Sequence, residues 1–153
     1  MTPSLKLDNQ LCFRHYTASR LITQAYHPLL EPLGLTYPQY LVMLVLWERD
    51  NQTVGDIARR LKLETNTITP LIKRMEQANL LDRSKGKTDS RQTIVSLSWR
   101  GRELEERAQQ IPECMIDTLQ CTTDDTSELK QMANLLDKLI ARLDSRQKNV
   151  NGS

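Results

Sequence analysis

A cysteine and two tyrosines near the N-terminus lie on one face of a predicted helix and can carry thiol chemistry. Cys12, Tyr16, Ser19, Thr23 and Tyr26 follow one another at intervals of four, three, four and three residues, the spacing of one helix face. The first turns of a helix favour a thiolate over a thiol, because the positive end of the helix dipole lies there. Tyrosine hydroxyls can donate hydrogen bonds to such a thiolate. The pattern indicates a redox-active cysteine, against the common alternative of a cysteine that packs as a small inert apolar group.

The two ends of this helix face cannot meet within one chain. Cys12 and Tyr26 are 14 residues apart, which is ~21 Å along a helix at ~1.5 Å per residue. No tyrosine side chain spans that distance. The two residues can meet only if the first helices of two chains run antiparallel, or nearly so, across a two-fold axis. A shared thiol site therefore predicts a homodimer.

The histidines offer weaker chemistry. His15 lies three residues from Cys12, and a cysteine–histidine nucleophile pair is the alternative that this spacing offers. No third orienting group or phosphate-cradling loop accompanies it. His27 precedes Pro28 and is expected at the surface. The 2 histidines and 3 dispersed cysteines do not form a metal site. We therefore expect no enzyme, no metal and no cofactor.

Cysteine usage also bears on the compartment. Cys114 and Cys121 are seven residues apart, two turns from each other and too far for a bond within one intact helix. An odd count of 3 cysteines without paired spacing indicates a reducing compartment. The N-terminus lacks the features of a signal peptide, and the apolar run Tyr40–Trp47 is too short to span a bilayer. We predict a cytoplasmic protein without a membrane partner.

The elements that must position these groups centre on a pair of short helices. Thr53 can begin the first, with Asp56 as its capping-box partner, and Thr65 begins the second after the joint Lys62–Glu64. Two such helices form a helix-turn-helix, although an ordinary solvated helix pair shows a similar pattern. The outer face of the second helix can reach base edges or phosphates through Thr65, Asn66, Thr67, Thr69, Lys73 and Arg74.

A basic hairpin directly after the second helix favours the helix-turn-helix. Leu80–Arg83 and Gln92–Ser98 are predicted strands, and a hairpin in this place is a wing. Its turn carries side chains suited to phosphates and to a minor groove, namely Lys85, Lys87 and Arg91. Asp89 stands two residues before Arg91 and can orient its guanidinium through a fork-type pair.

The distribution of charge agrees with a nucleic-acid partner. From Arg59 to Arg91 there are nine Lys or Arg and four Asp or Glu, a local charge of +5. The whole chain carries a net charge of only +2. Because the positive charge is concentrated on the helix-turn-helix and the wing, we predict that this region binds double-stranded DNA.

Helical patterns flank this region on both sides. Asp8 can cap a first helix that ends at Pro28. Ser98 can cap a long helix that runs to about Gln120, with a kink at Pro112. These two flanking helices frame the predicted DNA-binding region.

A last helix completes the pattern. Thr122, Thr123, Asp124 and Asp125 precede it, and the tail from 146 to 153 is expected to fray. Its apolar stripe alternates intervals of three and four through Leu129, Met132, Leu136, Leu139 and Leu143. The flanking helices carry more apolar surface than one small winged domain can cover. A second chain covers it in our interpretation, and a purely intramolecular bundle is the alternative.

Together these elements predict a mainly α fold with a small β-hairpin, in which a winged helix-turn-helix domain is flanked by helices that form a dimerisation bundle. We predict a single domain over 1–153, with 53–98 as helix-turn-helix plus wing and with 8–28 and 99–145 as dimerisation helices. A chain of 153 residues can bury a proper core. Only 5 Gly and 26% charged residues suit a mostly helical soluble protein.

With these elements in hand, the chain resembles the MarR family of transcriptional regulators, and more narrowly its organic-hydroperoxide-sensing (OhrR-like) branch. The stretches that carry the resemblance are LDNQLCF (7–13), PLLEPLGLTYPQYLVMLVLWE (28–48), ITPLIKRMEQANL (68–80) and DSR (89–91). It extends from about Leu7 to Leu143. It implies a dimeric winged-helix repressor of a roughly palindromic operator, which releases DNA when an organic hydroperoxide oxidises a thiol.

The resemblance also implies roles for single residues. Cys12 matches the sensing cysteine, and Tyr26 and Tyr37 match tyrosines that hydrogen-bond this thiol from the partner subunit. Tyr16 matches a further tyrosine nearby, and the wing pair of the family matches Asp89 and Arg91.

The chain departs from the two-cysteine members of this branch at one position. Asp117 stands where their resolving cysteine lies, Cys121 matches a second cysteine often found there, and Cys114 is extra. Oxidised Cys12 can therefore be resolved by Cys121 or Cys114 of the partner chain, or capped by a small thiol.

Two other functions stay compatible with the sequence. One is a MarR-type repressor released by a small aromatic or phenolic ligand in a dimer pocket. The other is a thiol peroxidase that turns over through Cys12.

Overall fold

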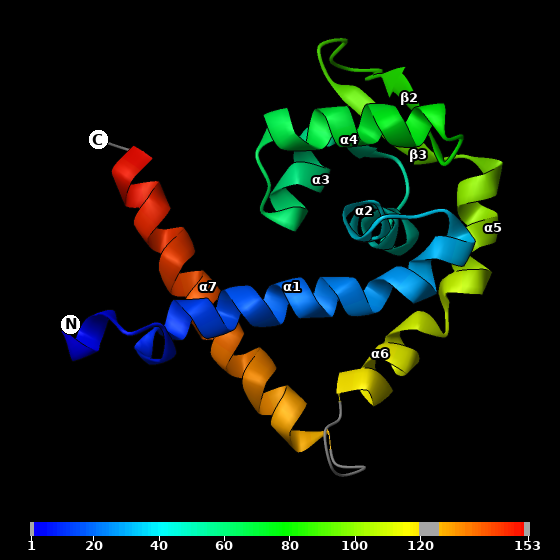
Figure 1. Cartoon of the computed structure of the whole chain (residues 1–153). Coiled ribbons are helices and arrows are strands. Elements are labelled where there is room, and N and C mark those ends of the chain that lie inside the picture. The colour runs from blue at the N-terminus through cyan, green and yellow to red at the C-terminus, as the bar shows by residue number, and fades with distance from the viewer. Residues whose placement is uncertain (1, 120–125, 152–153) are drawn as a thin grey trace. The chain divides into compact units, whose positions relative to one another are not determined.

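The computed structural model describes residues 2–119 and 126–151, with side chains as far as 148. The chain divides into two compact units, Met1–Ile111 and Pro112–Ser153. Each unit is described by itself, and Figure 1 gives the element labels used below.

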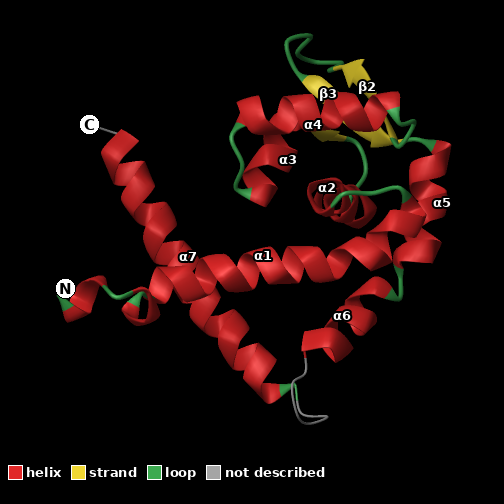
Figure 2. Cartoon of the chain, in the orientation of Figure 1, coloured by secondary structure: helices red, strands yellow, loops and turns green. Residues whose placement is uncertain are grey.

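Helices dominate the first unit, as predicted. Its elements in chain order are η1 (Pro3–Leu5), η2 (Leu7–Asn9), α1 (Leu11–Leu30), η3 (Glu31–Leu33), α2 (Tyr37–Glu48), β1 (Gln52–Thr53), α3 (Val54–Leu61), α4 (Thr65–Gln77), β2 (Leu81–Lys85), β3 (Thr93–Leu97) and α5 (Trp99–Ala108). Figure 2 shows the strands β2 and β3 beside α4. The predicted combination of a mainly helical fold with a small hairpin is confirmed.

The hairpin belongs to a three-stranded antiparallel sheet of order β1–β3–β2. β1, in which Gln52 pairs with Val95 and Thr53 with Ile94, was not predicted from the sequence. A strand of two residues is too short to show the alternation by which strands are recognised. It ties the start of the helix-turn-helix to the wing.

The core of this unit lies around α2. Val42, Met43 and Leu46 have no exposed surface, and α2 contacts α1, α3, α4 and α5. A helix with neighbours on several sides is apolar nearly all round, which explains the long hydrophobic run. Its N-terminus is fixed by the Thr36 backbone N–H, which donates to Gln39 Oε1 at 3.0 Å.

The helix-turn-helix forms within the predicted bounds. The Asp56 backbone N–H donates to Thr53 Oγ1 at 3.0 Å, which caps α3. Lys62 takes the left-handed conformation at the turn, with φ 53°, and Asn79 does so beyond α4, with φ 56°. Thr65 begins α4 as predicted.

The first helix begins later and ends later than predicted. Asp8 lies in η2 and does not cap α1, which begins at Leu11 after Gln10. Pro28, predicted to end the helix, lies inside it. Proline removes one helical hydrogen bond, but the following turn is held because Leu30 is only 1% exposed and its carbonyl accepts from the backbone N–H of Leu35 at 3.2 Å.

The long kinked helix predicted after Ser98 is wrong, because it forms two helices. α5 ends at Ala108 and α6 runs from Ile111 to Leu119. Pro112 has no N–H for the Ala108 carbonyl, and its ring would collide with that carbonyl in a continuous helix. As the second residue of α6, it occupies the first turn, where no N–H is needed.

The second unit holds most of α6 together with α7 (Ser127–Asn151). The tail predicted to fray is helical from 146 as far as Asn151. Five large apolar side chains on α7 are between 41% and 66% exposed, namely Met132, Leu135, Leu139, Ile140 and Leu143. The predicted helix-opening residues Thr122, Thr123, Asp124 and Asp125 lie outside the described residues.

Asp50 joins three elements of the first unit. Its Oδ1 accepts from the backbone N–H groups of Asn51 and Leu97, both at 2.8 Å, and its Oδ2 accepts from Arg102 Nη2 at 2.9 Å. Partial burial acts to raise the pKa of this carboxyl, but the bonds from Arg102, Leu97 and Asn51 outweigh it and lower the pKa below its ordinary value. The charged form is therefore the one that the fold stabilises.

We expect Asp50→Asn to lower the free energy of unfolding at pH 7 by about 1–2 kcal/mol, because the bonds to a charged acceptor are weakened. A lowered pKa in the folded state adds stability above the unfolded pKa of about 4, and this stability is lost as pH falls through the lower folded pKa. Urea unfolding at pH 7 and at about pH 3 should therefore show a wild-type advantage that shrinks in acid. Asp82→Asn, at an exposed carboxylate of β2, is the control, and an equal loss there would contradict the role of Asp50.

Candidate functional site

The outward face of α4 carries the predicted polar and basic residues. Ile68, Leu71, Ile72 and Met75 are buried, so the helix turns its other side outward. Exposed on that side are Thr65, Asn66, Thr67, Lys73 and Arg74, whereas Thr69 is half-buried. The Thr69 hydroxyl donates to the backbone oxygen of Thr65 at 2.8 Å, so its hydrogen is already used within the helix.

The wing turn is closed by its own backbone. The Gly86 N–H donates to the Gln92 oxygen at 2.9 Å, and the Gln92 N–H donates to the Asp89 oxygen at 3.1 Å. A Cβ at residue 86 would lie 2.5 Å from the Asp89 oxygen, so only glycine fits this turn. The closed turn exposes the predicted cations Lys85, Lys87 and Arg91.

The predicted fork-type pair in the wing is present. Asp89 Oδ1 accepts from the backbone N–H and the Nε of Arg91, at 3.0 and 3.2 Å, and Oδ2 lies 3.5 Å from Arg91 Nη2. The backbone N–H of Arg91, followed by its guanidinium, lowers the pKa of the Asp89 carboxyl. The Arg91 side chain stays 90% exposed, so the oriented guanidinium keeps N–H groups available for a ligand.

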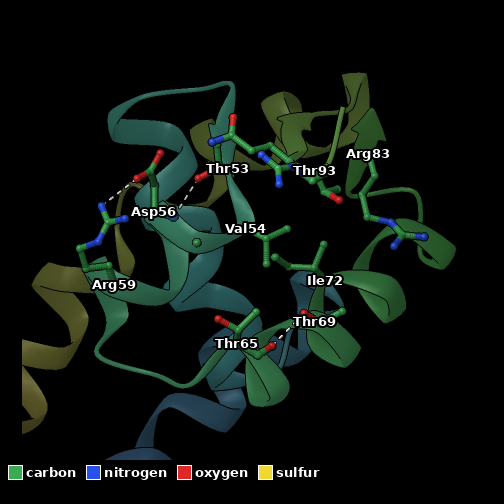
Figure 3. Close-up of a pocket in the computed structure, with 12 residues that line it drawn as sticks. Thr53, Val54, Asp56, Arg59, Thr65, Thr69, Ile72, Arg83 and Thr93 are labelled. Carbon is green, nitrogen blue, oxygen red and sulfur yellow. Dashed lines mark hydrogen bonds and ion pairs between the residues drawn. The ribbon is translucent and has the colours of Figure 1, made fainter. Parts of the chain in front are cut away.

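A cavity of about 410 Å³ lies where α3, α4 and the base of the wing meet (Figure 3). Its walls combine hydroxyls with guanidinium groups, and the lining residues are Thr53, Val54, Gly55, Asp56, Arg59, Thr65, Thr69, Ile72, Arg83, Arg91, Gln92 and Thr93. Thr65, Thr69 and Arg91 were predicted as binding residues. Arg59 and Arg83 were not, although both belong to the basic stretch seen in the sequence.

Ion pairs hold these two additional arginines. Arg59 Nη1 lies 2.8 Å from Asp56 Oδ1, a pair that the i,i+3 spacing on a helix could have indicated. Arg83 donates to Glu76 Oε2 from Nε at 2.8 Å and from Nη2 at 2.6 Å. The Arg83 bond lowers the pKa of the Glu76 carboxyl. This second pair fastens the wing strand β2 to the last turn of α4.

The residues of the predicted thiol site lie far apart in a single chain. Cys12 is the second residue of α1 and is exposed, and Tyr16 is exposed one turn later. Because α1 is continuous to Leu30, Tyr26 lies ~21 Å further along it. The structure therefore does not bring Cys12 to Tyr26 in a single chain.

Tyr26 and Tyr37 do come together, at the junction of α1 and α2. Their ring centroids lie 4.6 Å apart. Tyr40, which the sequence analysis did not propose for the site, joins them with its ring 5.8 Å from that of Tyr26. Its position three residues after Tyr37 on one helix was the available signal.

Burial raises the pKa values of this tyrosine cluster. Burial raises the pKa of Tyr26, with further increases from Tyr37 and Tyr40. Burial alone raises the pKa of Tyr37, and burial together with Tyr37 raises that of Tyr40. Phenols with raised pKa values carry their protons at neutral pH, so these hydroxyls are hydrogen-bond donors suited to an anionic acceptor.

A second cavity, of about 470 Å³, lies beside this cluster. It is lined by Thr23, His27, Leu30, Glu31, Gly34, Leu35, Thr36, Tyr37 and Pro38. Tyr37 thus belongs to both the tyrosine cluster and the wall of this cavity.

The remaining candidate groups are dispersed. Cys114 is exposed on α6, as is Asp117, and Cys121 lies outside the described residues. Among residues 2–119 and 126–151, no group of three His, Cys, Asp or Glu side chains is arranged to hold a metal ion. None of the helices described is by itself long and apolar enough to cross a membrane, and only the bent pair Leu11–Leu33 and Tyr37–Glu48 passes that test jointly.

Known sequences resemble this chain over nearly its whole length. The family model of the transcriptional regulator SarA/Rot matches residues 24–108. The organic hydroperoxide resistance transcriptional regulator of Bacillus subtilis is 41% identical over 145 residues, which cover 95% of each chain. The HTH-type transcriptional regulator MgrA of Staphylococcus aureus is 30% identical, covering 94% of this chain and 97% of MgrA.

Solved structures give the same result. Reduced AbfR bound to DNA matches with a TM-score of 0.76 and 37% identity, over 93% of this chain and 97% of that one. Overoxidised AbfR bound to DNA matches with a TM-score of 0.72 and 38% identity, over 90% and 94%. AbfR has also been solved as the protein of Staphylococcus epidermidis, at 37% identity and a TM-score of 0.72 over 91% of this chain and 92% of that one.

Proposed function

This chain belongs to the MarR family of transcriptional regulators, in the SarA/Rot group, and we propose that it is a homodimeric repressor that senses organic hydroperoxides through Cys12. Oxidation of Cys12 makes the dimer release its operator. The observation that carries this proposal is the division of the thiol site, with Cys12 at one end of α1 and the Tyr26–Tyr37 cluster at the other. The hydroperoxide-resistance regulator and the reduced and overoxidised DNA complexes among its relatives support it.

A second chain completes this site. Antiparallel α1 helices would bring Cys12 of one protomer to Tyr26 and Tyr37 of the partner subunit, which a single α1 keeps ~21 Å away. Apolar side chains without cover support the same arrangement, including Leu11 on α1 and Leu139 and Leu143 on α7. The dimer is therefore the sensing unit.

The sensing reaction is a two-electron oxidation of sulfur. The Cys12 thiolate attacks one peroxide oxygen, so that an S–O bond forms and the O–O bond breaks. Sulfur is oxidised to a sulfenic acid, the peroxide is reduced to an alcohol, and the leaving alkoxide takes up a proton. The sulfenic acid is bulkier than the thiolate and a poorer acceptor for the phenols of Tyr26 and Tyr37. Loss of these bonds lets α1 and the partner's α2 shift, which rotates the winged regions out of register with the DNA.

The next step consumes a second thiol. Asp117 stands where the usual resolving cysteine lies. We infer a disulfide between Cys12 and Cys121 of the partner subunit, formed with loss of water, because Cys121 matches a second cysteine often found in this branch. Cys114 of the partner subunit and a small cellular thiol are the other candidates.

The DNA-binding elements fit a duplex with two half-sites. The two α4 helices would enter successive major grooves ~34 Å apart. The wings would lie in the flanking minor grooves, with Arg91 held by Asp89. Arg59, Arg83 and Arg91 line the 410 Å³ cavity together with Thr65 of the first turn of α4 and offer guanidinium N–H donors there.

We expect Arg91→Ala to weaken operator binding by about 10- to 100-fold, because it removes an oriented cation from the minor groove. Lys85→Ala and Lys87→Ala should each cost only about two- to fivefold and lower the salt slope by about one. Operator titrations over a series of salt concentrations measure both quantities. Lys138→Ala, at an exposed cation of α7, is the control, and wild-type affinity of Arg91→Ala at physiological salt would show that the wing assignment is wrong.

One comparison separates the candidate functions. Operator binding by the wild type is measured before and after an organic hydroperoxide, and again with a phenolic ligand such as salicylate. Release by the hydroperoxide that a thiol reductant reverses supports the proposal. Release by the phenol alone would indicate the ligand-responsive repressor, and consumption of many peroxide molecules per chain would indicate a peroxidase. We propose a cytoplasmic, non-enzymatic regulator.

A further inference from the structure

We propose that Trp47 is a positioning residue that couples the tyrosine cluster to the joint between α4 and the wing. This inference rests on the function proposed above, because it concerns how oxidation at Cys12 reaches the DNA-binding elements. It follows from a continuous series of contacts within the first unit. The series begins at Tyr26 and Tyr37 and ends at Leu80.

The first part of the series is aromatic. Tyr26 lies with its ring 4.6 Å from that of Tyr37 and 5.8 Å from that of Tyr40. Tyr40 in turn meets Trp47 edge to face, with centroids 6.3 Å apart and an interplanar angle of 66°. Tyr40 is only 2% exposed, and packed interiors transmit a displacement rather than absorb it. A shift of the sensing tyrosines is therefore passed along α2 to Trp47.

The second part joins α2 to the start of α5. Trp47 Nε1 donates to the Gly101 backbone oxygen at 3.0 Å. Gly101 lies directly against the Leu80 backbone, because a Cβ at residue 101 would be 2.1 Å from the Leu80 oxygen. Gly101 therefore cannot move toward Leu80 without moving it as well.

The third part is the joint itself, which we define as Asn79 and Leu80. The Leu80 N–H donates to the Met75 oxygen at 3.0 Å, which fixes the joint to α4. Its carbonyl accepts from the Ser98 N–H at 3.2 Å, and the Ser98 hydroxyl donates to the Asn79 oxygen at 2.6 Å. Because β2 starts at the next residue, this joint sets the position of the wing relative to α4.

A purely packing role for Trp47 makes a different prediction from a positioning role. If Trp47 only filled the core, its replacement would change the stability of reduced and oxidised protein alike. If it carries the displacement, its replacement changes the ratio of the operator dissociation constants of the two states, because coupling is a difference between them. The ratio is the quantity to measure.

Trp47→Phe keeps an aromatic ring and removes the donor to Gly101. We expect the reduced variant to bind operator within about threefold of the wild type, and its Cys12 to be oxidised as completely, as trapping of the sulfenic acid with a dimedone reagent would record. We expect the loss of affinity on oxidation to be at least about fivefold smaller than in the wild type. The matched control is Trp99→Phe, at a residue of α5 that is 77% exposed, which should behave as the wild type.

A second measurement leaves Trp47 unaltered. The chain has 2 tryptophans, so Trp99→Phe makes Trp47 the sole indole reporter. We expect its fluorescence emission to change when this variant is oxidised by cumene hydroperoxide, and to stay constant in Trp99→Phe combined with Cys12→Ser.

The outcomes distinguish the coupling from the sensing function. If oxidised Trp47→Phe is released from the operator as fully as the oxidised wild type, the coupling is overturned while the proposed function stands. The same holds if the indole emission does not change when Cys12 is oxidised. An equal defect in Trp99→Phe also overturns it. If hydroperoxide does not release the wild type from its operator, the proposed function is overturned, and the coupling that depends on it is overturned as well.

Discussion

We expect the Cys12→Ser protein to bind its operator as the reduced wild type does and to stay bound after treatment with an organic hydroperoxide. Serine preserves the size of the side chain, so the reduced arrangement of the dimer forms. Its hydroxyl is not ionised at neutral pH and does not attack the peroxide. We expect the wild type to lose about 5- to 150-fold in affinity on oxidation, the range typical of coupled sites, and the variant to lose less than about twofold. Fluorescence anisotropy of a labelled operator duplex measures both.

The same samples test the step that follows oxidation. Non-reducing electrophoresis should show a covalent dimer in the wild type and in Cys114→Ser, a matched change at another exposed cysteine. The dimer should be absent in Cys12→Ser and in Cys121→Ser. A dimer lost only in Cys114→Ser would contradict the choice of Cys121, and its complete absence would indicate capping by a small thiol. DNA release that survives in Cys12→Ser would contradict the sensing mechanism.

A charge in the apolar stripe of α7 should abolish operator binding by separating the subunits. Leu139 is 41% exposed in the single chain, close to Leu143 and Ile140, which are also exposed. Burying a carboxylate in an interface costs several kcal/mol unless it is paired, so Leu139→Glu should give monomers. A monomer reads one half-site, and losing the link between two half-sites lowers affinity by about 10²- to 10⁴-fold. Sedimentation and anisotropy follow the two effects.

Asn134→Glu is the control for this variant. It adds the same charge to α7 at an exposed position on the side of the helix away from Leu139. We expect a dimer with wild-type affinity. A Leu139→Glu protein that remains dimeric would show that this face of α7 does not form the dimer interface. A wild type that is monomeric at micromolar concentration would contradict the proposal that two subunits share the thiol site.

Local signals were sufficient for much of the DNA-binding region. The cap at Thr53 uses an N–H three residues away, and the Asp89–Arg91 pair spans two residues. Such interactions depend on spacing along the chain, so the sequence contains them directly.

Features that depend on distant partners were not predicted. β1 exists because Gln52 and Thr53 meet β3 more than forty residues later. The helix through Pro28 depends on the burial of Leu30 rather than on a local stop signal. The burial of Leu30 in the core outweighs the local tendency of Pro28 to end the helix.

The proposed thiol site contains residues that could be predicted from the sequence and one residue that could not. The stripe from Cys12 to Tyr26 could be read from helical periodicity, and the continuity of α1 agrees with it. The cluster of Tyr26 with Tyr37 and Tyr40 needs the junction of two helices to be known. The resemblance to a family supplied Tyr37, and only the structure supplied Tyr40.

The close approach of Gly101 to Leu80 constrains how this protein can diversify. Any side chain at residue 101 would begin 2.1 Å from a backbone oxygen, whereas an alanine methyl at residue 55 would meet Thr53 Oγ1 at an ordinary 3.8 Å. Random mutagenesis should therefore recover functional variants at Gly55 and almost none at Gly101. An engineer who wishes to change the oxidant response without losing operator binding has freedom in the aromatic residues leading to this glycine and none at the glycine itself.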